Sequence, residues 1–246
     1  ISACLVGSEM CIRDSISTQQ SVTNSKACRF WKKNNATRIV LGREVSYDEL
    51  KLLLENLNNE IEIEYFIHGA VCISYSGRCM MSNNFSLRDA NVGGCAQSCR
   101  WKYEIVNKEL ENITDKYFTM SPKDMELIMN LDKLLDLNIA SFKVEGRMKS
   151  IHYVASVANA YREFIDSYNN NVNFDKNMIK QDLEKAENRL TDVAWFDGQP
   201  GYEKMLYFEL EKDISQIFAF NFEEIIDDKT FIAVSYTHLR AHETGR

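Results

Sequence analysis

Four cysteines within a stretch of 28 residues limit how this 246-residue chain can fold. Cys72, Cys79, Cys95 and Cys99 follow the spacing C-x6-C-x15-C-x3-C. This clustering predicts one shared site, because a disulfide framework would be spread over a small secreted domain. Structural zinc usually binds cysteine pairs with about two to four residues between them, which the first gap does not match. An iron–sulfur cluster is therefore favoured, with structural zinc or metal-free thiols as the alternatives.

The two ends of the chain differ in character from the rest. Residues 1–15 and 235–246 resemble translated sequencing-adapter sequence, so we expect them to be non-native and leave them out of the fold prediction. Cys4 and Cys11 fall within the first of these segments, which leaves Cys28 as the one cysteine outside the cluster. We expect Cys28 to be a small buried residue on a helix. The alternative is a nucleophile beside Arg29.

Strand-like and helix-like segments alternate along residues 16–196. Ser46 and Glu49 form a capping box that predicts a helix start, and residues 61–68 alternate as a strand does. Parallel strands joined by helices are the architecture that such alternation favours. We therefore predict an α/β fold, an incomplete TIM-like (β/α) barrel, with an open doubly wound sheet as the alternative. Further strands are expected at 38–41 and 139–145, and further helices from Ser25, from Ser121-Pro122-Lys123-Asp124, from Ser150 and over 176–189.

Two of these helices carry apolar residues whose spacing predicts a buried face. The first is expected to bury Ala27, Phe30 and Trp31. The long helix after Ser150 is expected to bury the residues that recur at helical spacing, namely Ile151, Val154, Ala158, Tyr161 and Ile165. After about Asp197 the helical pattern stops, and short strand-like runs at 205–210, 217–222 and 231–234 predict the start of a small β domain over 197–234.

Polar side chains near the ends of two predicted strands are the candidate catalytic residues. In a (β/α) barrel the active site lies at the carboxyl ends of the strands, where we expect Glu64, His68, Lys143 and Glu145 to meet. The carboxylates would position a substrate or act in acid–base chemistry. The alternatives are ion pairing inside the barrel for the glutamates and a hydrogen-bonded structural role for His68.

Basic residues next to these segments are candidates for substrate binding. Arg147 and Lys149 would bind a phosphate or the carboxylates of a small acid. Arg88 and Arg100 flank the cysteines and offer a local basic patch for an RNA backbone, which the net charge of −7 requires. Solvated surface positions are the alternative for all four. Trp101 is expected to pack in the core, with stacking on a base as the alternative.

The segment around the cysteines resembles the signature of peptidase family U32. Glu64, Phe66, Gly69 and Ala70 precede Cys72-x6-Cys79, and Ser82 follows. The resemblance covers residues 16–234. Further matching motifs lie at 17–19, 22–24, 41–44, 95–101, 121–124 and, above all, 141–149. By this resemblance Cys72, Cys79, Cys95 and Cys99 are the ligands of a 4Fe-4S cluster. The resemblance also implies that the family's first barrel strands are missing here and that the β domain is cut short, so we expect an incomplete barrel.

The resemblance implies an RNA-modifying hydroxylase more than a protease. The long match at 141–149 is most similar to the branch that hydroxylates tRNA uridine with prephenate as co-substrate. The implied setting is the cytoplasm, with tRNA and a homologous subunit as partners. No apolar run is long enough to cross a membrane. The alternatives are a collagenase-like U32 peptidase and a non-catalytic iron–sulfur partner subunit. The sequence contains neither the His-Glu-x-x-His nor the Gly-x-Ser-x-Gly motif that would indicate a peptidase. Outside the adapter-like ends it has two histidines, His68 and His152.

Overall fold

The computed structural model describes residues 15–101, 103, 107–108, 120–146, 149–185 and 189–205. The predicted β domain beyond residue 205, the adapter-like end at 235–246 and Arg147 lie outside the described residues, as does the adapter-like beginning up to residue 14. The chain divides into two compact units, which are described separately. One contains the residues up to Glu145 together with those from Thr191, and the other runs from Gly146 to Leu190. No described helix is both long and apolar enough to span a bilayer.

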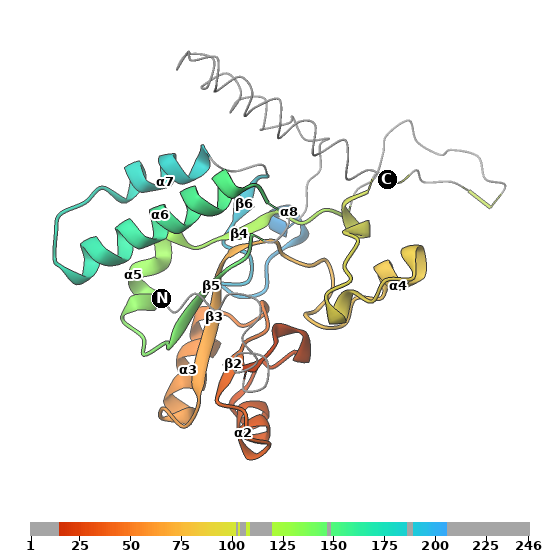
Figure 1. Cartoon of the computed structure of the whole chain (residues 1–246), viewed down its shortest axis with the longest axis horizontal. Helices are drawn as coiled ribbons and strands as arrows, with labels where there is room; N and C mark the ends of the chain where they lie inside the picture. The colour runs from red at the N-terminus through yellow and green to blue at the C-terminus, as the bar shows by residue number, and fades with distance from the viewer. Residues whose placement is uncertain are drawn as a thin grey trace, which may run out of the picture. The chain divides into compact units, whose positions relative to one another are not determined.

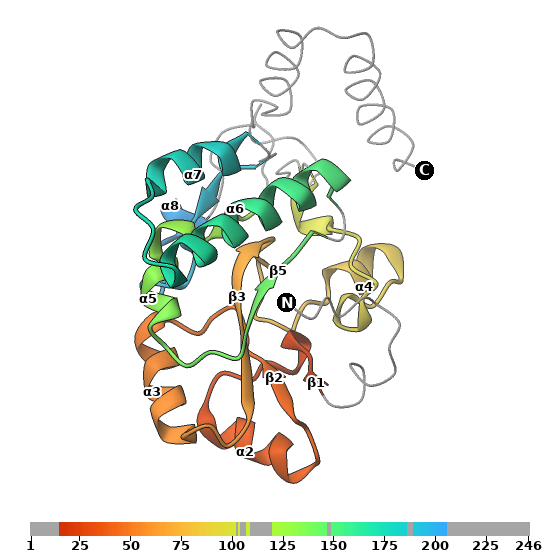
Figure 2. The same cartoon turned by 60° about the vertical axis from the view of Figure 1, so that its left-hand side comes forward.

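The first unit is built on parallel strands that alternate with helices (Figures 1 and 2). Ile39 of the second strand lies beside Ile16 on one side and Ile63 on the other, so that apolar residues fill the centre of the sheet. This part confirms the predicted strand–helix–strand alternation. The elements in chain order are β1 (Ser15–Ile16), η1 (Thr18–Gln20), α2 (Ser25–Lys33), β2 (Arg38–Val40), α3 (Tyr47–Leu57) and β3 (Glu62–Gly69).

The capping box predicted for α3 is confirmed. The Ser46 hydroxyl accepts a hydrogen bond from the Glu49 amide, and the Glu49 carboxylate accepts one from the Ser46 amide. Helix α2 also has its expected position, but its buried face was predicted wrongly. Cys28 is its fully buried residue, whereas Phe30 is exposed and packs its ring on Trp31. Ala27 and Trp31 are partly buried.

Two further strands pair with β3, and one of them replaces a predicted helix. Strand β5 (Ser141–Val144) runs parallel to β3, as predicted. Strand β4 (Asp124–Glu126) pairs antiparallel with the end of β3, and β6 (Thr191–Asp192) runs parallel to β4. The predicted helix start at 121–124 is therefore wrong. The Ser121 hydroxyl accepts a hydrogen bond from a side chain distant in sequence and does not cap a helix. The chain turns helical only at η4 (Ile128–Asn130) and α5 (Leu131–Leu135).

The resulting sheet is mixed but mostly parallel. Its strand order is β1-β2-β3-β4-β6, with β5 added to β3. Helix α5 and its approach bury Leu127, Ile128, Leu131 and Leu134. The α/β class predicted from the sequence is confirmed. Closure into a (β/α) barrel stays a prediction.

The second unit is a pair of helices, α6 (Ile151–Asn169) and α7 (Lys176–Glu184). Ser150 caps α6 as predicted, accepting a hydrogen bond from the Tyr153 amide. The predicted buried face was mostly wrong, since Ile151, Val154 and Ala158 are exposed. The aromatic residues of α6 satisfy the same helical spacing in a different phase, and their larger apolar area decides which side is buried. The buried residues are Tyr153, Val157, Ala160, Tyr161 and Phe164.

Candidate functional site: a four-cysteine region after strand β3

The cysteine-bearing segment leaves the sheet at the carboxyl end of β3. Figures 1 and 2 both show α4 (Met81–Ser86), which belongs to this segment, lying to the side of the sheet. Gly69 has a φ of 126°, and a Cβ atom there would lie 2.7 Å from the Cβ of Glu145. Only glycine fits this turn, because the backbone passes directly against the residue that follows β5. The short helices η2 (Ala90–Val92) and η3 (Ser98–Arg100) complete the segment.

The loop between Cys72 and Cys79 is fixed at its middle residue, Ser76. The Ser76 amide donates to the Glu44 carboxylate at 2.6 Å, and the Ser76 hydroxyl accepts from the Arg43 amide at 3.3 Å. The Ser21 hydroxyl donates to the Ser76 carbonyl. These bonds attach the loop to the turns that follow β1 and β2, so the positions of the first two cysteines depend on the parallel sheet.

The second pair of cysteines is held by hydrogen bonds within the segment. The Ser82 hydroxyl accepts from the Ala96 amide at 2.9 Å and lies 4.0 Å from the Cys95 sulfur. The Gln97 amide donates to the same sulfur at 3.3 Å. The Asn91 side-chain amide donates to the Cys79 carbonyl at 3.2 Å. The Gln97 amide therefore helps to fix the position of the Cys95 sulfur.

Arg100, the residue after Cys99, is buried and anchors the segment to the sheet. Its guanidinium donates to the carbonyl of Val71, which precedes Cys72, and forms an ion pair with Asp124 at 3.3 Å. It also donates to the Ser121 hydroxyl and the Pro122 carbonyl, both at 2.9 Å. Its side chain is only 10% exposed. The predicted role of Arg100 in a surface patch for RNA is therefore corrected, because its donors are used inside the protein.

The four thiols influence one another electrostatically. Burial raises the pKa of the Cys72 thiol, the Arg43 charge lowers it, and Glu145, Cys95 and Cys99 raise it. Burial likewise raises the pKa of Cys99, Arg100 opposes this effect, and Cys95 and Cys79 add to it. All four cysteines thus share one region. Within the described part of the chain, however, no three cysteine, histidine or acidic side chains are grouped closely enough to hold a metal ion. Four thiols are the donor set that iron–sulfur clusters use.

The predicted catalytic residues fall into two groups rather than one. Glu64 and Lys143 lie along the strands and form an ion pair at 3.2 Å, with Ser141 also donating to Glu64. His68 and Glu145 lie at the strand ends, where the Glu145 amide donates to the His68 carbonyl at 2.9 Å. The register places Glu64 beside Ser141, four residues before Glu145. Glu64 and Glu145 are therefore separated by about 13 Å along the strand and do not converge.

Sequence reasoning missed Arg43, which lies three residues after the end of β2. Its side chain is 9% exposed, its Nη2 atom forms an ion pair with Glu145 at 2.6 Å, and its guanidinium lies 4.1 Å from the ring centre of Phe66. Among the residues that the structure describes, the Nε and Nη1 atoms have no hydrogen-bond partner. Its place in the loop that follows a parallel strand was the sequence signal that would have identified it.

Aromatic side chains are exposed beside the cysteines. Trp101 is 44% exposed, so the expected core position is wrong. Phe85 is 56% exposed, and its ring centre lies 6.1 Å from those of both Trp101 and Tyr103. Arg88, predicted as part of a basic patch, is exposed. We call Phe85, Trp101 and Tyr103 the aromatic surface.

The other candidate residues have separate settings. Lys149 is in the second unit, where its ammonium group lies 4.7 Å from the ring centre of Tyr153. Cys28 is fully buried, and burial raises its pKa to about 11, which confirms the expected buried role.

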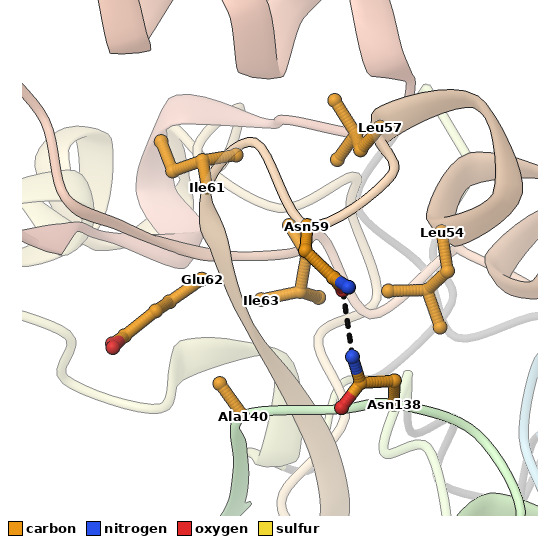
Figure 3. Close-up of a pocket in the computed structure, with 8 residues that line it drawn as sticks. All are labelled: Leu54, Leu57, Asn59, Ile61, Glu62, Ile63, Asn138 and Ala140. Carbon is orange, nitrogen blue, oxygen red and sulfur yellow. Dashed lines mark hydrogen bonds between the residues drawn. The ribbon is translucent and has the colours of Figure 1, made fainter.

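A pocket in the first unit lies at the opposite end of the strands from the cysteines (Figure 3). It lies where β3 begins and where the chain enters β5, and the Asn138 amide donates to Asn59 across it at 2.7 Å. In α/β folds, function concentrates at the carboxyl ends of the strands, so this pocket is not the candidate site. Its lining residues are Leu54, Leu57, Asn59, Ile61, Glu62, Ile63, Asn138 and Ala140.

Fold and site together define an α/β protein with a four-cysteine segment at the carboxyl end of a central parallel strand. The chain belongs to peptidase family U32, whose family model matches residues 8–206. It is 47% identical over 206 residues to tRNA hydroxylation protein P1 of Bacillus subtilis, covering 80% of this chain and 48% of that protein.

Two further relatives show how varied the names in this family are. An uncharacterized protease of Methanocaldococcus jannaschii is 34% identical, over 86% of this chain and 53% of that protein. A 23S rRNA 5-hydroxycytidine synthase of Escherichia coli is 34% identical, over 61% of this chain and 23% of that protein. The chain thus spans about half the length of the first two relatives. No solved structure matches it.

Proposed function

We propose that this chain is the cysteine-bearing part of an enzyme that hydroxylates uridine in tRNA to 5-hydroxyuridine. The observation that carries the proposal is the 47% identity to a tRNA hydroxylation protein. A second relative is named for a hydroxylated cytidine of ribosomal RNA, which supports RNA hydroxylation as the shared chemistry. A tRNA substrate implies that the protein works in the cytoplasm.

A 4Fe-4S cluster held by Cys72, Cys79, Cys95 and Cys99 is part of the proposal. Two observations support this part of the proposal: four thiols are the donor set that such clusters use, and the Gln97 amide is directed at the Cys95 sulfur. When bound, such a cluster supplies one-electron transfer. The chain's own contribution is to hold the ligands, with Ser76 fixing the first loop to the sheet and Arg100 linking Cys99 to the residue before Cys72.

The aromatic surface is the proposed contact for an unpaired stretch of tRNA. Single-stranded RNA is bound by aromatic rings on which bases stack, together with arginines that bind phosphates. Phe85 and Trp101 offer exposed rings, and Arg88, three residues after Phe85 in the sequence, is also exposed. Because the chain carries a net charge of −7, such a local basic and aromatic site suits RNA better than general electrostatic attraction.

Glu145 is the proposed polar group nearest the reaction. It follows β5, is 36% exposed and lies in the electrostatic environment of Cys72. His68 is fully buried, so we assign it a supporting role in the strand-end structure. Glu64 and Lys143 neutralise each other in an ion pair and help to hold β3 against β5. Prephenate, the co-substrate implied by the family resemblance, is part of the proposal as the small acid used in the reaction.

A peptidase is the second candidate, favoured by the family name and by the relative named as a protease. Cys28 does not supply its nucleophile, since a thiol with a pKa of about 11 is protonated at neutral pH. The third candidate is a non-catalytic subunit that acts beside a homologous partner. Stable copurification with such a partner, together with full activity of that partner alone, would favour it.

The test is deletion of the full-length gene, followed by mass spectrometry of tRNA nucleosides. We expect 5-hydroxyuridine to disappear and to return with the wild-type gene. The Cys99→Ala variant should fail to restore it, whereas the matched control Cys28→Ala should succeed because that thiol lies outside the cluster. Unchanged 5-hydroxyuridine after deletion would contradict the proposal, and peptide cleavage abolished by a single substitution would support the peptidase.

A further inference from the structure

Arg43 carries hydrogen-bond donors that the protein itself does not satisfy. Its side chain is about nine-tenths buried, and the Nε and Nη1 atoms have neither solvent contact nor a partner among the described residues. A buried donor left unpaired is destabilising, and most buried polar groups are paired. A guanidinium kept in this state suggests that an acceptor binds there when the protein works.

The surroundings of Arg43 suit a small anionic ligand. Arg43 follows β2 and Glu145 follows β5, so both lie at the carboxyl ends of parallel strands. Two cations share one ring, because the Arg43 guanidinium lies 4.1 Å and the Lys143 ammonium 5.7 Å from the centre of Phe66. Lys143 and Glu145 are each more than one-third exposed, so a small molecule reaches this region from solvent.

The charges here are balanced only in part. Glu145 holds the Nη2 atom of Arg43 through one oxygen, and Glu64 pairs with Lys143 and Arg38. Neither carboxylate reaches the Nε or Nη1 atom of Arg43. The planar guanidinium presents its donors along more than one edge, in a geometry that matches carboxylate oxygens. The unsatisfied Nε and Nη1 atoms are therefore donors that a carboxylate could use in addition to the Glu145 contact, once a local movement admits it.

We propose that Arg43 binds the carboxylate of a small organic acid at the carboxyl ends of β2, β3 and β5, with Lys143 as the second cation. This inference rests on the proposed function, in which a small acid is the co-substrate, and it assigns that acid a binding residue. The position beside Cys72 would place the acid next to the cysteine site. A backbone phosphate of RNA suits the site less well, because the guanidinium is buried, whereas Arg78 and Arg88 are exposed.

The test is isothermal titration of prephenate into the full-length protein, purified without oxygen. Arg43→Gln should weaken binding by at least about tenfold, because it removes a charge-assisted hydrogen bond. Arg43→Lys keeps the positive charge but loses the planar set of guanidinium donors, and should give an intermediate dissociation constant. The matched control Arg29→Gln removes an exposed arginine paired with Glu60 and should bind as the wild type does. Iron content and melting temperature are measured for each variant.

Three outcomes would overturn the inference. The first is a wild-type protein that does not bind prephenate, and the second is an Arg43→Gln variant that binds it normally. The third is loss of iron in Arg43→Lys together with loss of binding, which would make Arg43 a support for the cysteine site. Restoration of 5-hydroxyuridine in tRNA by the wild-type gene is a separate measurement. The proposed function therefore stands or fails independently of the assignment of Arg43.

Discussion

Replacing Arg100 with methionine should destabilise the protein strongly. Arg100 forms four hydrogen bonds, and its ion-pair partner Asp124 is only 3% exposed. Removing one partner of a buried ion pair costs about 3–5 kcal/mol. Because Arg100 also holds the Val71 carbonyl, we expect the variant to lose bound iron as well as stability.

Urea unfolding of the full-length protein, followed by circular dichroism, measures this effect. The double variant Arg100→Met/Asp124→Asn removes the buried negative charge and should recover at least about 1 kcal/mol of the loss. The control Arg88→Gln changes an exposed arginine and should alter the free energy of unfolding by no more than about 0.5 kcal/mol. The reasoning is refuted when Arg100→Met is as stable as Arg88→Gln, or when the double variant is no more stable than the single one.

Four further predictions concern other parts of the first unit. Native Cys28 should react with iodoacetamide at pH 8 about a hundredfold more slowly than an ordinary exposed thiol, because burial raises its pKa to about 11. Peptide mass spectrometry locates the labelled thiol, and rapid labelling of Cys28 would count against this prediction. The same shift makes Cys28 contribute stability below its unfolded pKa, and this contribution should fall as the pH rises from about 9 towards 11. Gly77→Ala should lower the melting temperature and the iron content of the protein. Gly77 has a φ of 74°, and a Cβ atom there would lie 1.8 Å from the Gln19 carbonyl oxygen. Normal iron content in this variant would show that the contact does not position the cysteines. Trp101→Ala should weaken tRNA binding by about 1–3 kcal/mol in a filter-binding assay, and an unchanged dissociation constant would exclude stacking on Trp101.

Local sequence signals predicted the first part of the fold well. The capping box at Ser46 and Glu49, the short strand at 38–40 and the alternating strand over 62–69 all depend on neighbouring residues, and all are present. The segment at 121–126 could not be predicted in this way. Its cap-like serine is bound by Arg100, a partner more than twenty residues away, and its side chains are buried by tertiary packing.

The candidate site shows the same division between local and long-range information. The clustering of the cysteines was visible in their spacing, and the electrostatic coupling of their thiols places them in one region. The convergence of Glu64 with Glu145 was expected from strand order, but the register of β3 against β5 separates them. For the same reason Arg43 was missed, and Arg100 was expected at the surface although its side chain is only 10% exposed. An arginine's burial depends on which distant groups face it, and this is decided only when the strands assemble.

Iron and sulfide analysis of the full-length protein, purified without oxygen, tests the cysteine site most directly. We expect about four iron and four sulfide ions per chain, with broad visible absorbance that Cys99→Ala abolishes and Cys28→Ala leaves intact. Protein that contains zinc in place of iron, or an intact cluster in the Cys99→Ala variant, would contradict the assignment of these four thiols to one iron–sulfur centre.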